Sequence, residues 1–166
     1  MASNVRPIPE GYHSISPALT CKNAARAIDF YKEAFGATEI MRMSGPGGSI
    51  GHAELRIGDS VIFVSDEFPG MSAAPAPGAA PSSYLFFYTE DVDATCNRAV
   101  AAGATVAMPV SDMFWGDRFG KLTDPFGHSW GVATHVEDVA PDEMARRSAE
   151  WTAKMSGQAA AAAGQD

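Results

Sequence analysis

The sequence predicts an α+β fold in which a βαβββ unit occurs twice. Three observations lead to this prediction: strand-like alternation of apolar residues, helices bounded by capping residues, and an internal repeat. Gly36-Ala37-Thr38 followed by Met41 recurs as Gly103-Ala104-Thr105 followed by Met108. The spacing is 67 residues in both cases, from 36 to 103 and from 41 to 108. It aligns the strands and helices of the two halves.

The first module is expected over residues 13–66, after an extended N-terminal arm at 1–12. Asn23 is a suitable helix N-cap and Gly36 a suitable left-handed C-cap, so they bound a helix. Glycine-rich turns separate the segments that alternate as strands. The expected elements are a strand over 15–21, a helix over 24–35, and strands over 38–43, 50–57 and 60–65.

The second module is expected over residues 84–138, after a linker at 67–83 that is rich in Pro, Gly, Ala and Ser. Asp91 caps the predicted helix and Gly103 ends it. An Asp-Pro-Phe-Gly turn at 124–127 precedes the last strand. The expected elements are a strand over 84–89, a helix over 92–102, and strands over 105–109, 118–123 and 128–135.

A C-terminal helix is expected over residues 139–156, because Pro141 suits the first helical turn and acidic residues follow it. Met144, Ser148, Trp151 and Met155 recur at helical spacing and give this helix one moderately apolar face. Residues 157–166, which include five alanines, are expected to form a disordered tail.

Composition excludes several classes of function. The formal charge of −8 and the lack of a Lys/Arg-rich run argue against nucleic acid as a partner. No apolar run approaches the ~20 residues that a membrane span needs, and the N-terminus lacks the apolar region of a signal peptide. Neither Cys21, at a predicted strand end, nor Cys96, in a helical pattern, has a metal-binding spacing, so both are expected to act as small apolar residues. The protein is therefore expected to be cytoplasmic.

His52 and Glu54 form the first candidate for chemistry. They alternate on one predicted strand, so their side chains leave the same face. They are a candidate catalytic acid–base pair, with Glu54 orienting the imidazole, and equally a candidate pair of ligands for a displaced metal. The alternative is a solvated pair on the open side of a strand.

Aromatic and charged residues near the end of the chain form the second candidate, a ligand-binding set. Trp115 is expected to act as an aromatic lid and Arg118 to clamp an anionic group. Asp117 and Arg118 are adjacent on a strand, so only one of them is expected to face a pocket. The alternative is a structural salt bridge. The predicted ligand-binding residues are Trp115, Asp117, Arg118, Tyr84, Tyr88 and Trp130.

The two βαβββ modules with their Asp-Pro-Phe-Gly turn resemble the vicinal oxygen chelate superfamily, which holds glyoxalase I, bleomycin resistance proteins and extradiol dioxygenases. Four runs are similar to its PhnB-like branch: Phe30-Tyr31-Lys32-Glu33-Ala34-Phe35-Gly36-Ala37, His52-Ala53-Glu54-Leu55, Trp115-Gly116-Asp117-Arg118 and Asp124-Pro125-Phe126-Gly127-His128. The resemblance covers residues 12–138 and implies that the duplicated modules form a curled mixed sheet with a cleft. It also implies a homodimer whose open half-barrels are completed by the partner subunit.

The resemblance also implies where a metal would be held. Its ligand positions fall on Ser16, on the strand near Ile62–Val64, on Tyr84 and on Gly131. None of these supplies an imidazole or a carboxylate, the groups that divalent metals need, so no cofactor is expected. The predicted function is binding of a small aromatic or polar molecule in the cleft, without the usual metal site. The alternative is a metal-dependent lyase, isomerase or dioxygenase-like enzyme whose shifted ligand set includes His52 and Glu54.

Overall fold

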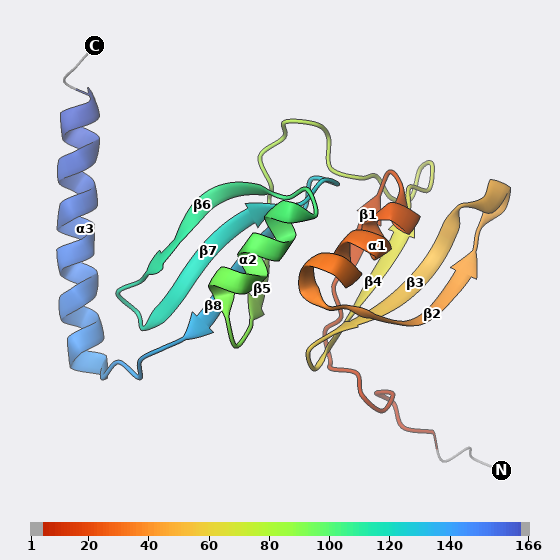
Figure 1. The fold of residues 1–166 in the computed structure, drawn as a ribbon, viewed down its shortest axis with the longest axis horizontal. Helices are drawn as coiled ribbons and strands as arrows, with labels where there is room; N and C mark the ends of the chain where they lie inside the picture. Colours follow the sequence, from red (N-terminus) through yellow and green to blue (C-terminus); the bar gives the residue numbers. More distant parts are fainter. Residues whose placement is uncertain (1–4, 164–166) are drawn as a thin grey trace.

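The structure is a computed structural model that describes residues 5–163, and it contains two four-stranded mixed sheets that do not close into a barrel (Figure 1). The first module holds β1 (Ala18–Cys21), α1 (Ala24–Phe35), β2 (Thr38–Ser44), β3 (Ile50–Ile57) and β4 (Ser60–Asp66), with a short 3-10 turn at Pro46–Gly48. The second holds β5 (Leu85–Tyr88), α2 (Val92–Ala101), β6 (Thr105–Asp112), β7 (Asp117–Thr123) and β8 (Ser129–His135). The helix α3 (Pro141–Ala163) follows them.

The predicted duplication is confirmed by the sheet topology. The strand order is β1-β4-β3-β2 in one sheet and β5-β8-β7-β6 in the other. In each sheet the first and last strands of the module pair in parallel and the remaining pairs are antiparallel. The α+β fold and its paired βαβββ modules are therefore as the sequence predicts.

The two module helices begin and end at the residues that cap them. The side chain of Asn23 accepts from the backbone N–H of Arg26, and Gly36 adopts the left-handed conformation (φ 67°) after α1. Asp91 accepts from the backbone N–H of Ala94 at the start of α2. These contacts satisfy N–H groups that the first helical turn leaves without a partner.

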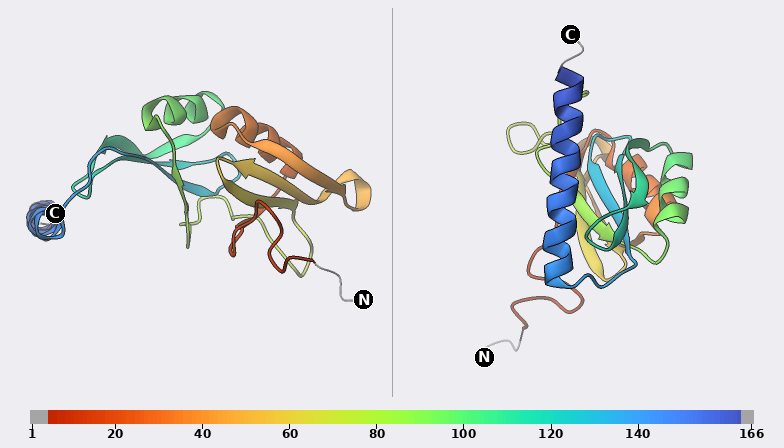
Figure 2. Two further views of the ribbon diagram at one scale, coloured as in Figure 1. Left: turned by 90° about the horizontal axis from the view of Figure 1, so that it is seen from below. Right: turned by 90° about the vertical axis from the view of Figure 1, so that its left-hand side faces the viewer.

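Both helices cover the same side of the two sheets, and no helix of the described residues lies on the opposite side of either module (Figure 2). The core lies between the helices and the sheets, where apolar side chains of alternate strand positions meet them. In β3 these are Ala53, Leu55 and Ile57, while His52 and Glu54 point away from the core. Each sheet thus has one buried face and one face without helices, which we call the open face.

A buried carboxylate, Asp124, joins the two modules. One of its oxygens accepts from the hydroxyl of Tyr31 in α1 (2.8 Å) and from the indole of Trp130 in β8 (3.0 Å). The other accepts from the backbone N–H groups of Phe126 and His128. The Asp-Pro-Phe-Gly turn is therefore tied directly to the first module's helix.

Two strand boundaries differ by three residues from the predicted ones, the others by at most one, and proline accounts for both of the larger differences. β1 begins at Ala18 rather than at 15, because Pro17 has no N–H to extend the ladder. β6 continues past Pro109 to Asp112, because this strand lies at the sheet edge and its register shifts between Met108 and Ser111. An edge strand tolerates a proline whose missing N–H faces away from its neighbour.

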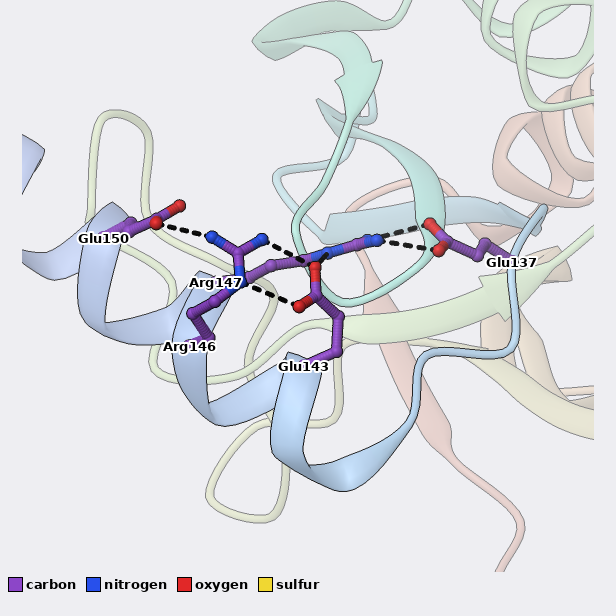
Figure 3. A network of polar contacts seen from close by, with 5 residues as sticks. All are labelled: Glu137, Glu143, Arg146, Arg147 and Glu150. Atoms are coloured by element: carbon purple, nitrogen blue, oxygen red, sulfur yellow. Dashed lines mark hydrogen bonds and ion pairs between the residues drawn. The ribbon is translucent and has the colours of Figure 1, made fainter.

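The C-terminal helix α3 lies at one end of the molecule, beside the second module (Figure 1). Arg147 attaches it to the preceding segment through paired bonds to Glu137, and it also reaches Glu143 (Figure 3). Helix α3 continues through Ala163 instead of ending near 156, since a run of alanines has the strongest helix propensity. The ends of the predicted arm and tail, residues 1–4 and 164–166, lie outside the described residues. None of the described helices is long and apolar enough to cross a membrane.

Candidate functional site

The open face of the second module carries a continuous group of aromatic side chains. Two come from β5, one from the residue just before it, one from β7 and one from the loop before β7. We call them the aromatic floor: Tyr84, Phe86, Tyr88, Phe119 and Trp115. The rings of Phe86 and Phe119 are stacked, with centroids 5.4 Å apart. The ring centroids of Phe86 and Tyr88 are 5.0 Å apart. The Lys121 ammonium lies 4.1 Å from the Tyr84 ring centroid, a cation–π contact at one end of the floor.

Gly131 in β8 lies directly beneath this floor. A Cβ atom placed there would stand 2.8 Å from the Phe119 ring and 3.0 Å from the Tyr84 ring. Both separations are shorter than van der Waals contact, so the two rings occupy the space that a side chain would need. A metal-binding carboxylate at position 131 is incompatible with the floor as it is packed.

A groove of about 780 Å³ runs between the modules and borders the floor. Tyr84, Phe86 and Tyr88 line one wall, and Ile15 and Pro17 belong to the other. Its volume lies in the ~300–1,000 Å³ range of small-molecule sites. The floor therefore adjoins a recess large enough for a small ligand.

Asp117 is the polar centre of the open face of the second module. Its carboxylate is buried, although the strand position faces away from the helices. One oxygen accepts from the Trp115 indole (2.9 Å) and the Tyr88 hydroxyl (3.1 Å), and the other from His135 Nδ1 (2.8 Å). Burial and the Asp117 hydrogen bond raise the pKa of Tyr88, so its phenol stays protonated. Asp117 thereby fixes two rings of the floor.

Arg118 does not join this site. Its guanidinium lies on the helix side of the sheet, where Nε and Nη2 bond Asp93 of α2 at 2.6 and 2.8 Å. A third bond, of 3.0 Å, reaches Asp112. These carboxylates raise the pKa of Arg118 further above its usual value. The side chain expected to clamp a ligand instead forms the structural salt bridge that was its alternative, because adjacent strand residues point to opposite faces.

Of the other predicted ligand-binding residues, four lie on the open face and one lies in the core. Trp115, Asp117, Tyr84 and Tyr88 come together on the open face. Trp130 instead lies in the core with 2% of its surface exposed, packed on Phe35 (4.6 Å between ring centroids). Trp130 is nevertheless among the residues that line the groove.

His52 and Glu54 form the expected pair on the open face of the first module, with His52 Nε2 3.2 Å from a Glu54 oxygen. The second Glu54 oxygen accepts from the hydroxyl of Tyr12, which the N-terminal arm brings over the sheet. Chiefly the Tyr12 hydrogen bond, and then His52, lowers the pKa of Glu54. The His52 ring also packs on the Phe63 ring, with 5.0 Å between their centroids. Both carboxylate oxygens are therefore engaged within the chain.

The residues present do not fit the metal site that the resemblance implies. Its positions fall on Ser16, on Ile62–Val64 of β4, on Tyr84 and on Gly131, and the last of these is covered by the floor. Within residues 5–163, no group of three or more His, Cys, Asp or Glu side chains is arranged to hold a metal ion. His52 and Glu54 supply two such groups, fewer than a typical site needs.

Sequence reasoning missed Phe119, His135 and Tyr12 as members of these sites. Phe119 was findable, because it alternates with Asp117 and Lys121 along one strand. His135 and Tyr12 were not, since their partners Asp117 and Glu54 are distant in the chain. Those contacts depend on the pairing of β7 with β8 and on the path of the arm.

Comparisons with known proteins agree with this architecture. The family model of the glyoxalase/bleomycin resistance protein/dioxygenase superfamily matches residues 13–132. The uncharacterised protein Rv0887c of Mycobacterium tuberculosis is 40% identical over 148 residues, covering 87% of this chain and 84% of its own.

Two solved structures illustrate the fold. TioX from Micromonospora sp. ML1 superposes with a TM-score of 0.61 at 27% identity, covering 75% of this chain and 99% of its own. A PhnB protein from Bacillus cereus superposes with a TM-score of 0.57 at 18% identity, over 74% and 99% of the two chains. The second likeness concerns the fold alone.

Proposed function

The chain belongs to the glyoxalase/bleomycin resistance protein/dioxygenase superfamily, and we propose that it binds a small, planar aromatic molecule on the open face of its second module without the usual metal site. The observation that carries the proposal is the aromatic floor beside the groove. Phe86 and Tyr88 are exposed on this face, at 42% and 60%. Exposed aromatic side chains gathered beside a concave recess are typical of a ligand site.

The chemistry of the floor favours a flat, unsaturated ligand. Offset or edge-on contacts between aromatic rings contribute about 0.5–1.5 kcal/mol beyond the apolar area that they bury. Because Asp117 and the Phe119 stack hold several of these rings in place, little side-chain freedom remains to be lost on binding. A saturated ring of equal size gains the burial without the ring–ring contact.

Calorimetric titration with naphthamide, set against its saturated decalin analogue, tests this proposal. We expect the aromatic compound to bind more tightly, and Phe86→Ala to weaken it about tenfold, a loss of about 1.4 kcal/mol. Phe63→Ala is the matched control, because Phe63 is an aromatic residue on the open face of the first module. Equal losses in the two variants, or no preference for the aromatic compound, would contradict the proposal.

The alternative is a metal-dependent enzyme using His52 and Glu54. Elemental analysis of protein purified without chelators distinguishes it from a metal-independent binding protein. We expect no stoichiometric zinc, nickel, iron or manganese, since these two side chains need further ligands. Stoichiometric metal that disappears in His52→Ala would overturn the proposal and support a lyase, isomerase or dioxygenase-like activity.

We also propose that the protein acts as a homodimer in the cytoplasm. The open side of the first module carries an exposed apolar residue, Met43, which is a candidate for burial against a second copy. The free cysteines Cys21 and Cys96 suit a reducing compartment. Light scattering should give twice the mass of one chain; the mass of a single chain would contradict the dimer.

A further inference from the structure

His135 stands at the edge of the aromatic floor between two carboxylates. Its Nδ1 lies 2.8 Å from Asp117 and its Nε2 lies 3.0 Å from Asp138. The imidazole is about half exposed, at 52% of its side-chain surface. Because a carboxylate only accepts hydrogen bonds, both ring nitrogens act as donors in this arrangement, which is that of an imidazolium.

The inner carboxylate is a fixed part of the fold. Asp117 is buried and also accepts from Trp115 and Tyr88. Its hydrogen bond, with a smaller contribution from Asp138, raises the pKa of His135 above the usual value. Asp117 therefore both orients the ring and favours its charged form.

The outer carboxylate is held far less firmly. The side chain of Asp138 is fully exposed, and among the residues that the structure describes its one side-chain hydrogen bond is the contact with His135. A solvent-facing ion pair of this kind contributes little, because water screens it. The neighbouring Glu137 is already paired with Arg147, at 2.8 Å, and does not compete for the imidazole. The Nε2–H of His135 thus has an anionic partner that is easily exchanged.

We propose that this Nε2–H is the subsite for the anionic oxygen of an aromatic acid whose ring lies on the floor, the ligand oxygen taking the place of Asp138. This inference rests on the proposed function and narrows it to carboxylate-bearing aromatic molecules. The exchange is of one anionic acceptor for another, so it keeps the hydrogen bond and the charge balance at His135. Asp138 then mimics the ligand when the site is free.

Lys121 provides a second cation on the same face, so the experiment must distinguish carboxylate binding at Lys121 from binding at His135. In the β7–β8 register Lys121 lies opposite Gly131, and Asp117 lies opposite His135. Four residues of strand separate the two ends, a distance of ~13 Å. A single carboxylate on a small aromatic body therefore reaches one of the two cations, and substitutions can show which.

The test compares naphthoate with naphthamide by calorimetry, because the two differ in charge at nearly equal shape. For the unaltered protein we expect naphthoate to bind about tenfold more tightly, or ~1.4 kcal/mol. His135→Gln should bring the ratio of the two affinities to about one. Asp138→Asn should strengthen naphthoate binding several-fold by removing its competitor. The preference for naphthoate should also fall as pH rises through the pKa of His135, since the imidazolium loses its proton.

The outcomes separate this inference from the proposed function. Equal affinities for both compounds, or a preference that survives His135→Gln and disappears in Lys121→Gln, would overturn the inference alone. Weaker naphthoate binding in Asp138→Asn would overturn it too, because it would show that the His135–Asp138 contact serves the fold. Binding of neither compound would overturn the proposed function and the inference together. Circular dichroism of each variant establishes that it is folded.

Discussion

Asp117 and Asp124 are two buried carboxylates with nearly the same partners and opposite surroundings. Each accepts from the indole of a tryptophan and the hydroxyl of a tyrosine. Around Asp124 those rings, Trp130 and Tyr31, are buried in the core, and backbone N–H groups complete the set. Around Asp117 the tyrosine is exposed, and an imidazole on the molecular surface completes the set.

The difference follows from the side of the sheet that each carboxylate serves. Asp124 binds α1 of the first module to the turn of the second, so its hydrogen bonds are part of the fold. Asp117 arranges Trp115, Tyr88 and His135 on the face without helices. The same types of side chain therefore stabilise the contact between the modules at Asp124 and hold exposed rings in place at Asp117. Residue types alone do not distinguish the two.

The largest expected effect is on stability, from Asp124→Ala. Two buried side-chain donors, those of Tyr31 and Trp130, lose their acceptor at about 1–3 kcal/mol each, so the free energy of unfolding should fall by about 2–6 kcal/mol. Denaturant unfolding measures it. Asp117→Ala is the matched variant and should cost less, because Tyr88 and His135 can turn to water. An equal or greater loss for Asp117→Ala would contradict the conclusion that Asp124 stabilises the fold and Asp117 mainly arranges exposed side chains.

The next effect concerns the pKa of His135. Asp117→Asn replaces the charged acceptor whose hydrogen bond contributes most to raising it by a neutral one, so the pKa should fall. A raised pKa in the folded state gives stability that is present at low pH and is lost as pH rises through that pKa. The asparagine variant should therefore show a flatter dependence of unfolding free energy on pH in this range.

Imidazole proton shifts in an NMR titration report the His135 pKa directly. Asp124→Asn is the control, because Asp124 does not contact His135 and should leave this titration unchanged. A pKa that stays the same in Asp117→Asn would show that Asp138 alone sets it.

Most of the fold could be predicted from local signals. The caps at Asn23 and Asp91, the glycines that end the helices and the 67-residue repeat from Gly36 to Gly103 fix the order of elements. The larger errors have two sources, one in tertiary structure and one in a local signal that was not used. An edge position lets β6 continue past Pro109, and alanine propensity carries α3 to Ala163.

The candidate site could be predicted only in part. Alternation through β5 and the residue before it brings Tyr84 and Tyr88 to one face, and alternation along β7 separates Asp117 from Arg118. Alternation alone does not say which member of an adjacent pair faces the helix. The register of β7 with β8, which brings His135 to Asp117, depends on sheet pairing that no short stretch of sequence specifies.

The smallest expected effect is that of Arg118→Gln, on the opposite side of the strand from Asp117. Arg118 pairs with Asp93 and Asp112 at a solvent-accessible edge, and such pairs contribute little because water and salt screen them. We expect a slight drop in the melting temperature that shrinks further at high salt, and no change in naphthamide affinity. Lys121→Gln is the matched substitution on the open face. It should lower the naphthamide affinity, since the Lys121 ammonium packs on the Tyr84 ring of the aromatic floor. If Arg118→Gln instead abolished binding, the ligand would have to contact the helix side of the sheet, and the assignment of the open face as the binding surface would be wrong.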